Sequence, residues 1–137
     1  MQRLAVFVLA LMVLPACGSP DSGSPGPSIV ITDPSTGNVV IPTGNAVNPV
    51  PLTDATLVEV DGNLVRLSAW MGVEPCDVID RVEVTETDTT VDIEIFRGVG
   101  DIAATCIAIA VERIIEVELD TPLGDRTLTL SGVELST

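Results

Sequence analysis

From Thr56 onwards, apolar residues that are mostly β-branched alternate with charged and polar ones. A period of two is typical of a β-strand with one face in the core and the other in water. The first such segment, 56–70, contains two runs around Asp61-Gly62, a dipeptide that is a strong signal for a tight hairpin turn. A two-residue turn at this dipeptide predicts that Val58 faces Val65 and that Glu59 faces Leu64.

The segment 80–96 predicts a second hairpin, with Asp88-Thr89 at its tip. An even-numbered loop is required, because a slip of one residue would turn the whole apolar set outward. The predicted inward pairs are Val84 with Ile93 and Val82 with Ile95. On the wet face, the same register sets Glu83 against Glu94 and Thr85 against Asp92.

The remaining residues predict further strands. Residues 106–119 are interpreted as one long strand, bulged near Arg113, because their large aliphatic residues share one parity from Ile107 to Leu119. Residues 120–124 supply a turn, and a last strand follows at about 126–131. Six short strands in about eighty residues predict an all-β domain, either a small antiparallel sandwich or an open barrel.

The first sixteen residues have the pattern of a secretory signal. Arg3 precedes thirteen residues, 4–16, that carry no charge. A membrane-spanning helix needs about twenty apolar residues, so this run predicts a cleaved leader rather than a membrane span.

Leu14-Pro15-Ala16-Cys17 resembles the bacterial lipobox, in which the leader is cut before a cysteine that carries a diacylglyceryl group. The resemblance implies cleavage between Ala16 and Cys17 and lipidation of Cys17. Two or three acyl chains would anchor the chain firmly, whereas one would bind reversibly. The alternative is an ordinary secretory leader that leaves Cys17 as a free thiol.

The chain has three cysteines, and lipidation of Cys17 would leave Cys76 and Cys106 as an even pair outside the reducing cytoplasm. We expect these two to form a disulfide, because a domain of about eighty residues with few aromatic residues needs a covalent staple. Two separate thiols are the alternative. A metal site is disfavoured, because the chain has no histidine to complete it.

Between the leader and the alternating segments, residues 17–53 contain seven of the ten prolines, together with glycine, serine and asparagine. This composition predicts a disordered linker after the lipidated cysteine, reaching about 30–35 Å as a coil. Two β-branched islands, 29–31 and 39–41, leave open a loose hairpin or a strand docked on the domain. The predicted organisation is therefore a signal peptide at 1–16, a linker at 17–53 and a β domain at 54–137.

Four stretches carry a second resemblance: Val73-Glu74-Pro75-Cys76, Asp80-Arg81-Val82-Glu83-Val84, Cys106-Ile107-Ala108, and 119–126 with its Pro-Leu-Gly-Asp-Arg turn. Over residues 56–132 the chain resembles a group of uncharacterised secreted proteins and lipoproteins from high-GC Gram-positive bacteria. The resemblance implies a disulfide-bonded β domain outside the cell membrane, and it implies no activity.

The net charge of the chain limits the classes of partner that it can bind. Six arginines and no lysine or histidine stand against twenty acidic residues, for a net charge of −14. This balance repels phosphate backbones, so we expect no nucleic-acid partner. The sequence predicts a lipoprotein without a cofactor, held on the extracytoplasmic face of the cell membrane by its lipid anchor, that displays a non-catalytic domain to an envelope protein partner.

Two other functions remain open. Glu83, Asp92 and Glu94 share the wet face of the predicted hairpin and are candidate ligands for a weakly bound divalent cation. A small hydrolase is the other alternative, although Ser68 has no histidine to activate it.

Overall fold

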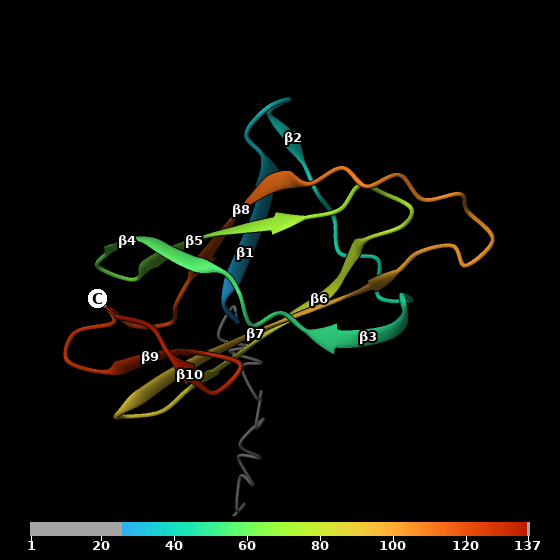
Figure 1. The fold of residues 1–137 in the computed structure, drawn as a ribbon. Helices are drawn as coiled ribbons and strands as arrows, with labels where there is room; N and C mark the ends of the chain where they lie inside the picture. The colour runs from blue at the N-terminus through green and yellow to red at the C-terminus, as the bar shows by residue number, and fades with distance from the viewer. Residues whose placement is uncertain (1–25, 137) are drawn as a thin grey trace, which may run out of the picture.

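The computed structural model describes residues 26–136, which form two β-sheets facing each other (Figure 1). No helix occurs in this range, and the sheets do not close into a barrel. The predicted all-β sandwich with one disulfide is therefore confirmed. The described residues contain ten strands rather than about six.

Sheet A has the strand order β2-β1-β8-β5-β4, and each pair of adjacent strands in it is antiparallel. Its strands are β1 (Ser28–Asp33), β2 (Asn38–Val39), β4 (Thr56–Asp61), β5 (Leu64–Met71) and β8 (Val111–Glu118). Sheet B is built around β7, which pairs with β6 and β3 antiparallel and with β9 parallel, and β9 pairs with β10. Its strands are β3 (Val47–Pro51), β6 (Val78–Glu86), β7 (Thr90–Val99), β9 (Thr127–Leu130) and β10 (Val133–Glu134).

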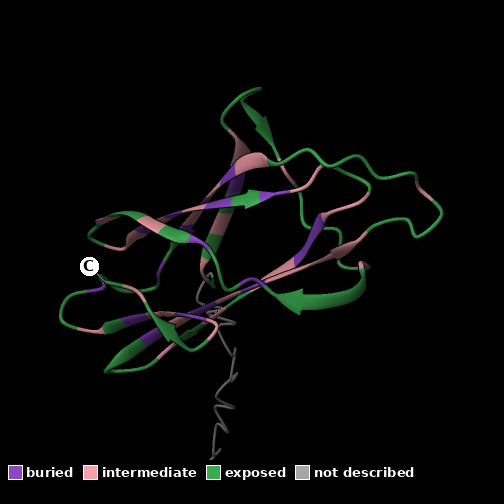
Figure 2. Cartoon of the chain, in the orientation of Figure 1, coloured by how far each residue is buried: buried purple, intermediate pink, exposed green. Residues whose placement is uncertain are grey.

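The buried residues lie on the strands of the two facing sheets (Figure 2). The core that they form is almost wholly aliphatic. Alternate residues along β5, β7 and β8 are fully buried, which is the outcome expected of the period-two pattern. The side chains with no exposed area are Val65, Leu67, Val91, Ile93, Ile95, Ile115 and Val117.

The β6–β7 hairpin has the predicted register. Val84 lies opposite Ile93 and Val82 opposite Ile95, with Asp88-Thr89 at the tip. A slip of one residue would turn the apolar residues of one arm outward, so the sequence pattern excluded the neighbouring registers, and the predicted tip fixed the rest.

The β4–β5 hairpin is two residues out of the predicted register, because its loop lies one residue later in the chain and Val65 pairs with Val60 rather than with Val58. Asp61 pairs with Leu64, so the loop is Gly62-Asn63 rather than Asp61-Gly62. Gly62 has φ 59° and takes the first loop position, where a type II′ turn requires glycine. The shift places Glu59 opposite Arg66, and the register changes again beside Val58, which remains largely exposed.

The predicted strand 106–119 is wrong over its first five residues. Strand β8 begins at Val111, and the exposed Ile107 and Ile109 belong to a connection that contains the disulfide. The predicted bulge near Arg113 is also wrong, because β8 pairs with β5 without a register shift. The shared parity of the isoleucines therefore begins before Val111, the first residue that has a partner strand.

The predicted linker 17–53 is wrong from Ser28 onwards. Strand β1 pairs along its length with β8, and β3 pairs with β7. Ile31 and Leu52 from this segment are buried in the core. The structure bears out both alternatives that the two islands left open: β1 and β2 form a short hairpin, and β1 docks on β8, whose edge needs a partner for its backbone N–H and C=O groups.

The chain between β2 and β3 is attached to β6. Thr43 N–H and Gly44 N–H donate to the carbonyl oxygens of Ile79 and Asp80, and Ala46 N–H donates to Asp80 Oδ1 at 2.8 Å. The Ala46 N–H and the Arg81 guanidinium hold the pKa of the Asp80 carboxyl below its usual value. A buried carboxylate thus fixes a stretch that the sequence assigned to the linker.

Candidate functional site

The two ends of the sandwich differ in chemistry. The end that we call the disulfide end consists of residues 72–77 and 100–110, two of the connections that cross between the sheets. Cys76 and Cys106 join these connections, with their Cα atoms 5.6 Å apart, and this confirms the predicted pairing. Three exposed isoleucines, Ile102, Ile107 and Ile109, lie on the second connection.

The opposite end, which we call the tether end, consists of Ser28, the β4–β5 loop, the tip of the β6–β7 hairpin and residues 119–126. Ser28 pairs with Glu118 there, so the chain that precedes β1 enters the domain at this end. A groove of about 260 Å³ between Gly26, Asn63 and Asp120 marks the same place.

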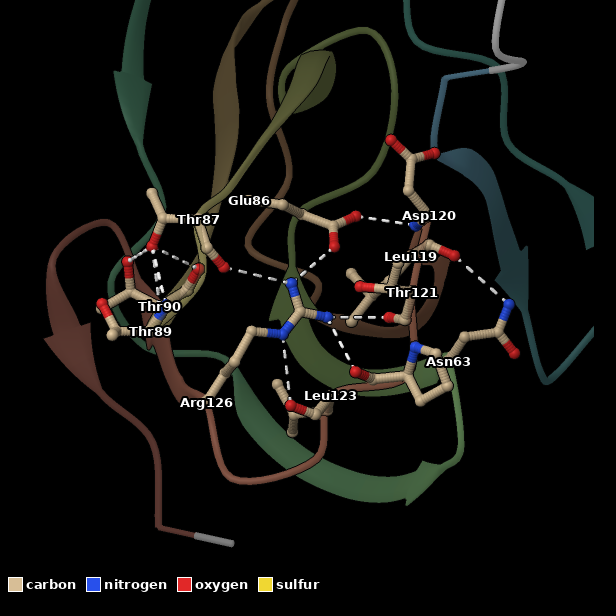
Figure 3. Close-up of polar contacts among 11 residues, drawn as sticks. Asn63, Glu86, Thr87, Thr89, Thr90, Leu119, Asp120, Thr121, Leu123 and Arg126 are labelled. Atoms are coloured by element: carbon tan, nitrogen blue, oxygen red, sulfur yellow. Dashed lines mark hydrogen bonds and ion pairs between the residues drawn. The ribbon is translucent and has the colours of Figure 1, made fainter.

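Arg126 holds the tether end together (Figure 3). Its guanidinium donates to Glu86 Oε2 at 2.7 Å and to the carbonyl oxygens of Thr121, Pro122 and Leu123. Burial raises the pKa of the Glu86 carboxyl, but hydrogen bonds from Arg126 and from the Asp120 N–H together outweigh it, so this pKa lies below its usual value. Arg126 therefore clamps the end of β6 to the connection 119–126.

Every arginine of the described residues is ion-paired. The pairs are Arg66 with Glu59 and Glu116, Arg81 with Asp80 and Glu83, Arg97 with Asp77, Arg113 with Asp33, and Arg126 with Glu86. The chain has no lysine or histidine, so the surface described by the structure offers carboxylates without a cationic partner but no unpaired cation. A charged partner of this surface must accordingly be basic.

Arg113 and Asp33 form a largely buried ion pair beside a groove in the surface. Arg113 lies on the core-facing side of β8 and donates through Nη1 to Asp33 Oδ2. The hydroxyl of Ser35 and then Arg113 lower the pKa of the Asp33 carboxyl from 3.8 to about 2. The pair lines a groove of about 600 Å³ with Val40, Ile41 and Glu74, and its two charges offset each other there.

Two of the three candidate cation ligands already accept hydrogen bonds from other groups. Glu83 accepts a hydrogen bond from Arg81 Nε at 2.5 Å, and Asp92 accepts from Thr129 Oγ1 and from Gly132 N–H. Glu94 does lie opposite Glu83, as predicted. Within residues 26–136, however, no group of three or more Asp, Glu, His or Cys side chains is positioned to hold a metal ion.

Ser68, the serine considered for a hydrolase, donates from Oγ to Glu112 Oε1 at 2.6 Å. Both side chains lie on the face of sheet A that points away from the core. A carboxylate in this position orients the hydroxyl, but the described residues hold no histidine to take its proton.

Trp70 is the aromatic residue that the fold leaves exposed. It lies opposite Glu112 in the β5–β8 pair, and 63 % of its surface is exposed. Both residues line a groove of about 400 Å³ with Pro34 and Val111. Sequence reasoning did not join these two residues, because the register between β5 and β8 depends on two strands some forty residues apart.

A scan of the chain against protein-family models found no match, and searches of curated proteins and of solved structures found none either. Cys17 and Ala16, the predicted lipidation and cleavage residues, lie outside the described residues. In the described range, no helix is long and apolar enough to cross a membrane.

Proposed function

We propose that the protein is a bacterial lipoprotein whose β-sandwich is displayed on the extracytoplasmic face of the cell membrane as a non-catalytic interaction module. The observation that carries the proposal is the Cys76–Cys106 bond. Disulfides persist in oxidising compartments, and this bond leaves Cys17 as the remaining cysteine of three, placed directly after a hydrophobic leader. A lipid on Cys17 accounts for that odd thiol.

The start of β1 shortens the tether that the sequence suggested. Only residues 18–27 separate Cys17 from Ser28. Ten residues of coil reach about 17 Å on average and about 35 Å when fully extended. The tether end would therefore lie close to the bilayer, and the disulfide end, with its exposed isoleucines, would point away from it.

The absence of unpaired arginines in the described surface supports a display role rather than lipid binding by the domain itself. An anionic bilayer repels a surface whose uncompensated charges are carboxylates. The anchor, not the sandwich, would supply the membrane affinity.

Expression of the full chain in a bacterial host with lipoprotein-processing enzymes tests the proposal. Mass spectrometry of the N-terminal peptide should find Cys17 at the new N-terminus with a diacylglyceryl group, and the protein should be released from membranes by detergent but not by salt. The Cys17→Ser chain is the matched control and should lose the lipid mass and the membrane fraction. An unmodified Cys17 thiol in the mature wild-type protein would refute the proposal.

A further inference from the structure

The outer face of sheet A, defined by the side chains that point away from the core on β4, β5 and β8, combines an exposed indole with a strip of carboxylates. Trp70 stands at its disulfide end, directly opposite Glu112. Side chains directly opposite each other in an antiparallel pair have Cβ atoms about 5 Å apart. The charged members of this face are Glu59, Asp61, Arg66, Glu112, Glu116 and Glu118.

The charges of this face are not balanced. Its one arginine, Arg66, is shared between Glu59 and Glu116. Glu112 has no ion-pair partner among the described residues, and its contact is the neutral hydroxyl of Ser68. The hydroxyl uses one lone pair of the carboxylate and holds its orientation, so the other acceptor sites of Glu112 remain available to a donor in the groove.

An indole ring beside an oriented carboxylate is suited to binding a cationic group. The ring attracts a positive group through its quadrupole, and tryptophan is the best of the aromatic side chains for this. The carboxylate adds a charge-assisted hydrogen bond. The chain itself contains a cation–π contact on sheet B, where the Arg81 guanidinium lies 3.7 Å from the centre of the Phe96 ring.

We propose that the groove between Trp70 and Glu112 binds a lysine or arginine side chain of a basic protein segment, which then lies along the carboxylates of sheet A. The inference rests on the proposed function, because it names the partner class that the displayed domain would bind. Charge complementarity decides in favour of a basic segment, since each arginine of the described surface is already neutralised.

The position of the groove fits a site on a displayed domain. Trp70 is six residues along β5 from Leu64, which lies at the tether end. Six strand residues span about 20 Å, so the groove would stand that much farther from the bilayer than the tether end. A partner could reach it without contacting lipid.

The sole tryptophan of the chain makes the site directly measurable, because indole emission reports Trp70 alone. The full chain, purified in detergent, is titrated with a hexapeptide that carries lysine at alternate positions. We expect a saturable change in emission that weakens as salt is added, because the charges are exposed to solvent. The same peptide with acetylated lysines should give no saturable change.

Glu112→Gln should weaken binding of the lysine peptide about twofold to fivefold, from loss of the exposed ion pair. Glu94→Gln is the matched control, since Glu94 lies on the outer face of sheet B, and it should bind as the wild type does. Both variants should melt at the wild-type temperature. Calorimetry of Trp70→Leu, which cannot be followed by emission, should find weaker binding than the wild type.

Three results would overturn the inference. Equal binding of the acetylated peptide would indicate apolar docking, a saturable response to a neutral disaccharide alone would indicate a carbohydrate site, and no response to any probe would indicate no site. The Cys17→Ser chain should bind the lysine peptide normally. Membrane anchoring and peptide binding are therefore measured separately, so a failure of the lipoprotein proposal can be distinguished from a failure of the peptide-binding proposal.

Discussion

Arg126 Nη1 lies 2.7 Å from Glu86 Oε2, and this ion pair joins the tip of the β6–β7 hairpin to the connection between β8 and β9. Both side chains are largely buried, with 11 % and 16 % of their surfaces exposed. The pair thus links the last strand of sheet A to the strands of sheet B at the tether end.

Removing one member of this pair should destabilise the protein strongly. Arg126→Met leaves the Glu86 carboxylate with little solvent and without its cation, and we expect a loss of about 3–5 kcal/mol in the free energy of unfolding. Urea unfolding followed by circular dichroism measures it. Glu83→Gln is the control, because the Arg81–Glu83 pair is half exposed and such pairs contribute about 1 kcal/mol or less. Equal losses in both variants would contradict the role given to Arg126.

Asp33 should make stability depend on pH at the acidic end of the range. Its pKa falls from 3.8 to about 2 on folding, chiefly through the hydrogen bond from Ser35 and then through Arg113. A carboxyl with a depressed folded pKa contributes stability above its unfolded pKa, and that contribution is lost as pH falls through the folded value. The stability difference between wild type and Asp33→Asn should therefore shrink between about pH 4 and pH 2.

Ser35→Ala provides a graded check, because it removes the largest cause of the Asp33 shift and keeps the Arg113 pair. Its stability should depend on pH less steeply than that of the wild type and more steeply than that of Asp33→Asn. Parallel pH profiles for all three chains would show that Asp33 does not titrate as stated.

A chain that begins at Asp54 should fail to fold, whereas one that begins at Gly26 should fold like the full chain. The shorter chain lacks β1 and β3, so the edge of β8 and the sites of Ile31 and Leu52 are open to water. Burial of each of these two side chains contributes about 1.5–3 kcal/mol. Circular dichroism melting of the two chains checks this, and a cooperative transition in the shorter one would restore the linker interpretation.

Opening the disulfide should cost about 3–4 kcal/mol. Cys76 and Cys106 close a loop of 30 residues, and the chain-entropy estimate for such a loop gives that value. The double variant Cys76→Ser/Cys106→Ser should unfold at a lower urea concentration than the wild type, with the wild type in reductant as a second measure. Unchanged midpoints in both would show that the loops are held by other contacts.

Gly98→Ala should loosen β3 from β7. A Cβ at residue 98 would lie 2.8 Å from the Val47 carbonyl oxygen and 3.0 Å from Ala46 Cβ, so the edge strand would have to move. We expect a loss of about 1–3 kcal/mol, the usual cost of overpacking. Gly26→Ala is the control, since a Cβ there meets nothing within 4 Å. Urea unfolding of the two variants should separate them.

The sequence determined the features that depend on neighbouring residues or on counting. The β6–β7 register followed from residues 80–96 alone, because the apolar pattern requires an even-numbered loop and Asp88-Thr89 was correctly taken as its tip. The Cys76–Cys106 pairing followed from a count of three cysteines and the position of the first.

Only the tertiary structure decided which segments lie beside β8. Ser28–Asp33 is surrounded by proline and glycine and reads as linker, yet it pairs with a strand some eighty residues later in the chain. The juxtaposition of Trp70 with Glu112 has the same origin. An unpaired strand edge can pair with any β-branched segment that the connecting loops allow to reach it. Which segment pairs there depends on the free energy of the whole sandwich rather than on the composition of any one segment.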